Sequence, residues 1–149
     1  MATIKSFEDI EVWQRARAFS LKIYDLTQEG SFAKDYSLRN QINDASGSVM
    51  DNIAEGFERG GNKEFINFLS YAKGSAGETR SQLYRAVDRK HITEETFVNL
   101  KTEALAISKM ISGFMSYLQT SSIRGSKFLE PFEGYGNHPI SDTDLSETN

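Results

Sequence analysis

The chain has 149 residues, of which 38% are hydrophobic and 11% aromatic. That length suits one domain with a substantial core, and the composition excludes an intrinsically disordered chain. Cysteine is absent, which excludes disulfides and thiolate chemistry. No apolar run approaches the roughly 20 residues of a membrane span, and the opening residues lack a signal-peptide apolar region. We therefore expect no membrane contact and a cytoplasmic location.

Charge is unevenly distributed along the chain. The formal net charge is −4, and residues 122–149 carry two basic and five acidic side chains, so the remaining chain is close to neutral. The totals show no basic footprint typical of a nucleic-acid-binding domain. A local basic face on one side of the body stays open.

The first predicted helix runs from about Phe7 to Gln28. Ser6 is its N-cap, and acidic residues occupy the first turn, where the helix dipole favours them. Gly30 is the expected C-cap, and the connector that follows brings Phe32 over the end of the core. The apolar stripe of this helix is Val12, Trp13, Ala16, Phe19, Ile23 and Leu26.

The second and third predicted helices form an antiparallel hairpin. One runs from Ser37 to about Glu58, and the other begins with the cap Asn62 and ends near Lys90. The link through Gly60 and its neighbour is too short for anything but a tight reversal. Apolar residues recur at helical spacing in both: Leu38, Ile42, Ala45, Val49 and Ile53, then Phe65, Phe68, Leu69, Ala72, Ala76 and Leu83.

A fourth helix completes the pattern. Thr93 caps it, and its apolar residues alternate three- and four-residue spacing: Phe97, Leu100, Ala104, Ile107, Ile111, Phe114 and Leu118. We predict an all-α fold, an up-down-up-down antiparallel four-helix bundle over residues 1–121. Residues 122–149 hold both prolines and several glycines, and we predict a flexible acidic tail there. Its apolar residues either fold back on the bundle, do nothing, or form a docking segment: Phe128, Leu129, Phe132 and Tyr135.

The stretch from Leu38 to Leu83 contains a specific pattern, in which several positions are polar or glycine and so do not follow from generic bundle patterning. The pattern consists of Gln41, Ala45, Ser48, Asn52-Ile53-Ala54-Glu55-Gly56, Arg59, Phe68, Ala72, Gly74-Ser75 and Glu78. With Phe7-Glu8-Asp9 and Val12-Trp13, they resemble bacterial four-helix-bundle proteins encoded in intervening sequences of large-subunit ribosomal RNA genes. The accessory variability protein of diversity-generating retroelements shares that fold family.

The resemblance implies a ring-like homopentamer. In the retroelement branch it also implies binding to a reverse transcriptase and to nucleic acid through a basic surface. The present sequence departs from a common family form at Asn43 and Asp44, where basic residues are frequent. That difference argues against carrying RNA binding over directly.

Glycines and small residues inside the helices have two interpretations. Gly47 and Gly56 each cost about 1 kcal/mol relative to Ala in a helix interior, so each predicts a close backbone approach. The glycine-rich segment from Lys73 to Arg80 resembles a phosphate-binding loop in composition, but it lacks the Gly-Lys-Ser/Thr ending and no predicted strand precedes it. We expect its small residues to allow close packing instead.

Polar residues of the hairpin form a candidate structural motif. We expect Asn52, Glu55 and Glu78 on or near its inner faces, where buried carboxylates and amides need partners. The full motif is Gln41, Asn52, Glu55, Gly56, Arg59 and Glu78. The alternative is a carboxylate metal site, but neither His91 nor His138 has the Glu-x-x-His spacing of bundle metal centres. We predict no cofactor, no metal and no nucleophilic catalysis.

A scattered set of basic residues is the candidate nucleic-acid or partner contact. It comprises Arg39, Lys63, Lys73, Arg80, Arg85, Arg89 and Lys90. Interleaved aromatic residues would suit base stacking, although aromatics at helical spacing are more often core or subunit interface.

The sequence therefore predicts a non-enzymatic, homo-oligomeric scaffold for a ribonucleoprotein or reverse transcriptase partner. Apolar residues off the bundle seams predict self-association, because large exposed patches usually mark interfaces: Phe57, Tyr71, Tyr84, Met110 and Tyr117. The alternative is direct RNA or DNA binding through basic patches on the oligomer. A carboxylate-based metalloenzyme is the third hypothesis.

Overall fold

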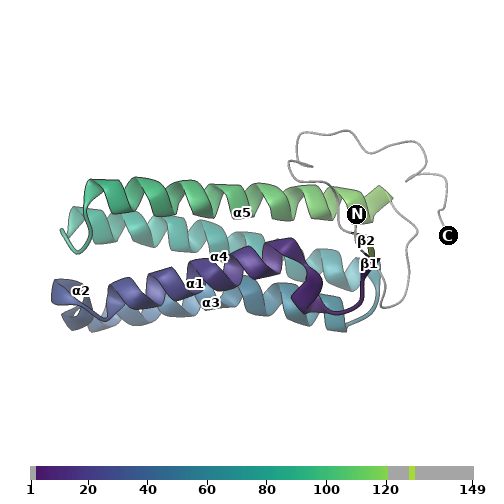
Figure 1. Cartoon of the computed structure of the whole chain (residues 1–149), viewed down its shortest axis with the longest axis horizontal. Helices are drawn as coiled ribbons and strands as arrows, with labels where there is room; N and C mark the ends of the chain where they lie inside the picture. The colour runs from purple at the N-terminus through teal and green to yellow at the C-terminus, as the bar shows by residue number, and fades with distance from the viewer. Residues whose placement is uncertain (1–2, 121–127, 130–149) are drawn as a thin grey trace.

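Helices make up almost all of the described chain. The computed structural model describes residues 3–120 and 128–129. Two short elements, a 3-10 turn and a five-residue helix, accompany four long helices (Figure 1). The elements are β1 (Thr3–Ile4), the 3-10 turn (Phe7–Asp9), α1 (Glu11–Thr27), α2 (Gly30–Lys34), α3 (Tyr36–Glu58), α4 (Asn62–Asp88), α5 (Glu94–Thr120) and β2 (Phe128–Leu129).

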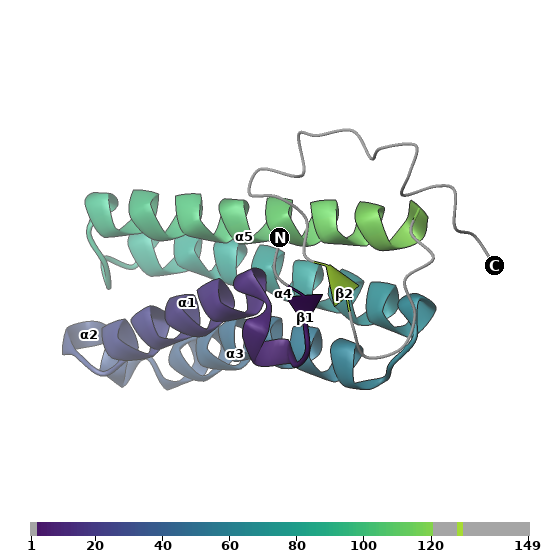
Figure 2. The same ribbon diagram turned by 45° about the vertical axis from the view of Figure 1, so that its right-hand side comes forward.

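The long helices form a closed antiparallel bundle. Helix α1 packs on α3, α3 on α4 and α4 on α5, and α1 also packs on α5, so the diagonal pairs are α1 with α4 and α3 with α5. The all-α four-helix bundle predicted from the periodicity is confirmed. Helices α1 and α5 pack least closely among these four pairs, and Figure 2 shows α1 inclined to α5.

The core follows the predicted apolar stripes. Phe19, Phe65 and Phe114 come from three different helices and are fully buried. Burying each such side chain contributes up to about 3 kcal/mol relative to leaving it in water, so these stripes hold the helices together. Phe65 contacts Phe114 with ring centroids 5.3 Å apart, which joins α4 to α5.

The first predicted helix is interrupted near its start. Asp9 accepts hydrogen bonds from the backbone N–H groups of Lys5 and Ser6 at 3.0 and 3.2 Å, which closes a tight turn. These N–H groups also hold the pKa of Asp9 below its usual value. Ile10 then adopts an extended backbone (ψ 120°) and is fully buried, so α1 begins only at Glu11.

The connector after α1 is itself helical. Gln28, and not the expected Gly30, is the C-cap of α1; Gly30, with φ +57°, is instead the first residue of α2. Phe32 on α2 is only 1% exposed, so it covers the end of the core as expected. Asp35, and not Ser37, caps α3, because its Oδ1 accepts the Leu38 N–H at 3.3 Å. Thr93 caps α5 as predicted, with its Oγ1 accepting the Thr96 N–H at 3.1 Å.

Two residues of the C-terminal segment return to the N-terminus. The strands β1 and β2 pair antiparallel, with Thr3 opposite Leu129 and Ile4 opposite Phe128. Phe132 and Tyr135, and the predicted flexibility of residues 122–149, lie outside the described residues. Among the described helices, none is both long enough and apolar enough to cross a membrane.

Candidate interaction surfaces

The polar motif residues lie along the outer seam between α3 and α4. Asn52 Nδ2 donates to the Ser48 carbonyl at 2.8 Å and to Ser48 Oγ at 2.9 Å. Ser75 Oγ on α4 donates to the same Ser48 Oγ at 3.1 Å. We name Ser48, Asn52 and Ser75 the seam triad. The Ser75–Ser48 hydrogen bond links the two helices, the bonds from Asn52 to Ser48 lie within α3, and all three side chains are half-buried.

The same seam continues toward the far end of the hairpin. Arg85 Nη2 donates to Gln41 Oε1 at 2.7 Å, which gives Gln41 a partner on the facing helix. Gln82 is 3% exposed, and its Nε2 donates to Glu78 Oε2 at 3.4 Å. The Gln82 Oε1 atom is buried and accepts no hydrogen bond from the described residues.

The expected burial of Glu55 and Glu78 is wrong. Both are exposed, because inner positions of the hairpin are filled by apolar side chains and the seam carries the polar ones outward. Arg59 pairs with Glu55 on its own helix at 3.1 Å and lies over the Phe68 ring at 5.0 Å. An exposed pair of this kind contributes at most about 1 kcal/mol.

Of the helix glycines considered in the sequence analysis, only Gly56 lies where two helices approach each other closely. A Cβ on Gly56 would lie 2.6 Å from Phe68 Cβ, so only glycine fits there. A Cβ on Gly47 would meet Ser20 Oγ only at 4.0 Å, and one on Gly74 or Gly77 would meet nothing within 4 Å. The close approach expected at Gly47 and the close packing expected at Gly74 and Gly77 are therefore wrong within a single chain.

Three of the seven candidate basic residues form hydrogen bonds within the chain, and the other four form no ion pair with a described residue. Arg39 donates to the Ala33 carbonyl at 2.9 Å, Arg85 binds Gln41, and Arg89 binds Asp35 at 2.8 Å. These bonds hold helix ends and occupy the guanidinium groups. Among the described residues no ion pair involves the other four, which are Lys63, Lys73, Arg80 and Lys90.

Four side chains far apart in the sequence form what we name the helix-end cluster. Asp35 Oδ2 lies 2.8 Å from His91 Nε2 and 2.8 Å from Arg89 Nη1, while His91 Nδ1 lies 2.7 Å from Ser31 Oγ. The hydrogen bond from His91, followed by that from Arg89, lowers the pKa of Asp35 to about 2. The cluster ties α2 and the start of α3 to the turn between α4 and α5.

Ser31, His91 and Asp35 are connected by hydrogen bonds in the same sequence as the serine, histidine and aspartate of a nucleophilic triad, which the sequence analysis did not predict. The histidine is turned the other way from that in a serine-protease triad, since Nδ1 of His91 faces the serine and Nε2 faces the carboxylate. Asp35 is shared with Arg89 and with the α3 cap, so its charge already serves the fold. No three metal-ligating side chains come together among the described residues.

A basic face crosses α4 and α5. Lys101 Nζ lies 3.4 Å from the Tyr84 hydroxyl and 5.6 Å from the Tyr84 ring centroid, which fixes the register of the two helices. Arg80 lies one turn before Tyr84 and Lys73 about two turns before that, on the same side of α4. Lys109 is exposed about two turns beyond Lys101. We define the basic face as Lys73, Arg80, Lys101 and Lys109; the sequence prediction missed the last two.

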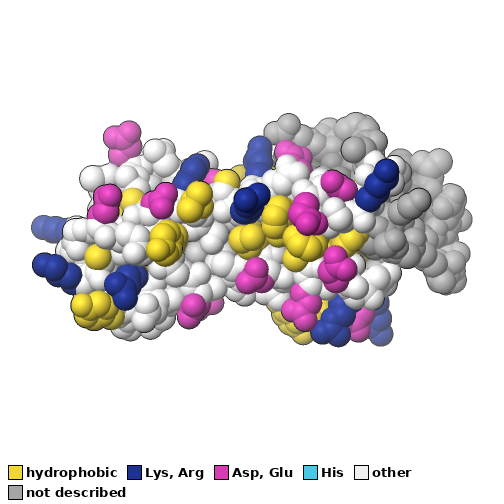
Figure 3. Space-filling model, turned by 60° about the horizontal axis from the view of Figure 1, so that its bottom comes forward, with side chains coloured by type: hydrophobic (Ala, Val, Ile, Leu, Met, Phe, Trp, Pro, Cys, Tyr) yellow, Lys and Arg dark blue, Asp and Glu magenta, His cyan; other side chains and the backbone are white. Residues whose placement is uncertain are grey.

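An acidic ridge runs along the outer edge of α3. Asp44, Asp51 and Glu58 are spaced seven residues apart, so they form one line, and all three are exposed. None forms an ion pair with a described residue. Figure 3, which brings the α1 and α3 side forward, shows acidic side chains interspersed with hydrophobic and basic ones.

The apolar residues expected to mark a subunit interface are mostly core. Phe57, Met110 and Tyr117 are at most 7% exposed, because each turns into the bundle. Tyr71 and Tyr84 are exposed as predicted, at 58% and 46%. The structure adds other exposed apolar side chains, at least 44% exposed: Leu21, Tyr24, Tyr36, Val98 and Leu105.

Fold and surface together define a small helical-bundle protein whose distinctive polar residues join helices and whose unpaired charges lie on outer faces. The chain matches the family model described as 23S rRNA-intervening sequence protein over residues 8–113, and it belongs to that family. Comparison with curated protein sequences finds no match.

A solved structure has the same fold. It is described as a protein of unknown function from the S23 ribosomal protein family of Bacteroides thetaiotaomicron, and it superposes with a TM-score of 0.64. The match covers 70% of this chain and 97% of that one at 23% identity. At this identity the likeness shows the fold alone, so the surfaces must be interpreted from the residues of this chain.

Proposed function

We propose that the protein is a non-enzymatic scaffold that assembles head to tail with copies of itself. The observation that carries the proposal is the presence of two surfaces of opposite charge on the same chain. The acidic ridge lies on α3, and the basic face lies on α4 and α5, with α5 diagonal to α3. Unpaired charges of opposite sign on different faces favour contact between copies.

This arrangement suits a ring better than a two-fold dimer. A two-fold interface uses one self-complementary patch, whereas a ring needs two different patches that fit each other. Each charged surface also has exposed apolar neighbours, Tyr36 at the start of α3 and Leu105 between Lys101 and Lys109. The homopentamer implied by the family resemblance is a ring of this kind, and its outer surface would hold a ribonucleoprotein or reverse transcriptase partner.

Charge reversal tests the pairing of the two surfaces. An acid-reversed variant carries Asp44→Lys, Asp51→Lys and Glu58→Lys, and a base-reversed variant carries Lys73→Glu, Arg80→Glu and Lys109→Glu. Each should assemble at least about tenfold more weakly than wild type, since several attractive pairs become repulsive. A swapped variant with all six changes should assemble again. Light scattering and sedimentation at micromolar concentration measure the mass.

Five of the six substituted side chains are exposed and Arg80 is half-buried, and none of the six forms an ion pair with a described residue. Each variant should therefore keep the circular dichroism and thermal midpoint of the wild type. A monomeric wild type at micromolar concentration would remove the scaffold proposal. If the wild type assembles and both charge-reversed variants have the same mass as the wild type, the protein self-associates but through an interface elsewhere.

A second candidate function is direct binding of RNA or DNA. It is favoured by the basic face, in which Lys101 contacts Tyr84 and Arg80 lies one turn before Tyr84, because cations next to an aromatic ring suit single strands. Phosphate contacts release counterions, so such binding should weaken steeply as salt rises. The base-reversed variant should lose it.

A further inference from the structure

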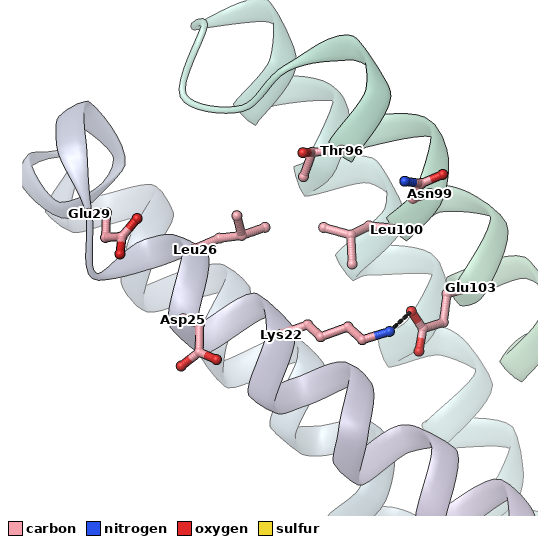
Figure 4. Close-up of a pocket in the computed structure, with 8 residues that line it drawn as sticks. All are labelled: Lys22, Asp25, Leu26, Glu29, Thr96, Asn99, Leu100 and Glu103. Atoms are coloured by element: carbon pink, nitrogen blue, oxygen red, sulfur yellow. Dashed lines mark hydrogen bonds and ion pairs between the residues drawn. The ribbon is translucent and has the colours of Figure 1, made fainter.

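A groove opens where α1 and α5 pack least closely. Its volume is about 400 Å³, within the range of small-molecule sites. Figure 4 shows Leu26 and Leu100 pointing toward one another from the two helices, with polar side chains around them. The polar residues are Lys22, Asp25 and Glu29 from the α1 side and Thr96, Asn99 and Glu103 from α5.

One aliphatic ammonium group already crosses this groove. The Lys22 side chain reaches from α1 to α5, and its Nζ donates to Glu103 Oε2 at 3.1 Å (Figure 4). The methylene stem of a lysine packs well on apolar surface while its charged end seeks a carboxylate. The Lys22 side chain thus shows which ligand chemistry the groove accommodates.

The remaining charges of the groove are not balanced. Asp25 and Glu29 are one turn apart on the α1 side, and neither forms an ion pair with a described residue. Lys22 is the single cation among the groove residues, against three carboxylates. An apolar floor between carboxylates fits a ligand with methylene chains between positive charges.

We propose that the α1–α5 groove binds a linear aliphatic polyamine. Its methylene chain lies on Leu26 and Leu100, and its ammonium groups bind Asp25, Glu29 and Glu103. Lys22 competes internally for Glu103, so it weakens binding. A compact hydrated dication such as Mg²⁺ gains nothing from the apolar floor and is bound more weakly. The site is independent of the assembly proposed above, since neither charged surface contributes to it.

Spermidine titrated into the full chain tests the site by calorimetry. Saturable binding of one spermidine per chain is expected. The Asp25→Asn/Glu29→Gln variant should bind at least about tenfold more weakly. The matched control, Glu78→Gln/Asp88→Asn on α4, has the same change in net charge and should bind like the wild type.

The Lys22→Met variant gives the sharper test, because it should gain affinity. It keeps the aliphatic stem, removes the competing ammonium group and frees Glu103. Spermidine should bind about fivefold more tightly, the equivalent of about 1 kcal/mol for one partly exposed pair. A structural role of the Lys22–Glu103 pair alone would leave binding unchanged.

Three results would overturn the proposal. They are equal losses in the groove variant and the α4 control, displacement of spermidine by equimolar Mg²⁺, and binding of a lysine-rich peptide without binding of spermidine. The first two would show general attraction to an acidic protein, and the third would show a peptide site. The circular dichroism of each variant confirms that the bundle is intact.

Discussion

Gly56 is a residue at which α3 and α4 approach each other closely. The Phe68 Cβ would lie 2.6 Å from a Cβ on Gly56, and Phe65 Cδ1 would lie 3.0 Å away. Gly56→Ala should therefore lower the free energy of unfolding by about 1–3 kcal/mol, the usual cost of overpacking a rigid site. Urea denaturation measures the loss.

Gly47→Ala is the matched control for this prediction. The new methyl group meets only Ser20 Oγ at 4.0 Å, and alanine favours a helix interior by about 1 kcal/mol over glycine. The monomer should become more stable. Equal destabilisation by both substitutions would mean that the close approach at Gly56 does not exist.

Asp35 predicts a specific dependence of stability on pH. Hydrogen bonds from His91 and Arg89 lower its folded-state pKa from 3.8 to about 2. A carboxyl with a lowered folded-state pKa stabilises the protein above its unfolded pKa, and the contribution is lost as pH falls through the folded value. The stability difference between wild type and Asp35→Asn should be constant above about pH 5 and should shrink between about pH 4 and 2.

Urea denaturation at several pH values measures that difference. Asp44→Asn is the control, because the Asp44 carboxyl is exposed and has no ion pair among the described residues. A difference between wild type and Asp35→Asn that does not change with pH would contradict the helix-end cluster.

Residue-level prediction from sequence succeeded at Gly56, which faces the next helix as helical periodicity indicates. The hydrogen bond from Asn52 to Ser48, one turn earlier, was not predicted, although it too depends only on local spacing. The helix-end cluster could not be predicted, because Ser31 and His91 are 60 positions apart and meet only through the packing of three elements. Lys101 and Lys109 carried a signal, their eight-residue spacing along one side of a helix.

At the scale of elements, the long helices followed from apolar periodicity, whereas their ends followed from single polar groups. The turn closed by Asp9 shortens α1, and Asp35 starts α3 one turn before the apolar residue that periodicity identifies. Asn43 donates to Thr27 Oγ1 at 2.9 Å and so joins α3 to the end of α1. Such bonds depend on which helices become neighbours.

The C-terminal segment supplies a prediction about an element. Its described part is the two-residue strand β2, which pairs with β1. A pairing this short contributes little to stability, whereas the four long helices carry the core. Deleting residues 122–149 should lower the thermal midpoint by less than about 5 °C, equivalent to roughly 1–2 kcal/mol in a domain of this size. Calorimetry of the truncated and full chains measures the shift, and a larger drop would assign the segment a structural role.

At the scale of the whole molecule, the acidic ridge and the basic face connect the two candidate functions. If copies assemble through both surfaces, the basic face is covered in the ring and cannot bind phosphates at the same time. The two ligands, a second copy and a nucleic acid, then compete for Lys73 and Arg80. Such competition can be observed with the wild-type protein, because nucleic acid should then dissociate the assembly.

Short single-stranded RNA added at low salt should therefore dissociate the wild-type assembly. A ligand that binds only the separated chain shifts the equilibrium toward it by mass action. Light scattering should show a fall in mass as RNA is added, and the fall caused by RNA should become smaller as salt rises, because salt weakens phosphate contacts. The protein without RNA at each salt concentration is the reference, since salt also screens the pairing of the acidic ridge with the basic face. An uncharged oligomer of similar length is the control, since it has no phosphates to bind the basic face and should leave the mass unchanged. RNA that binds the intact assembly without lowering its mass would show that the basic face stays open in the assembly, so the interface between copies would lie elsewhere.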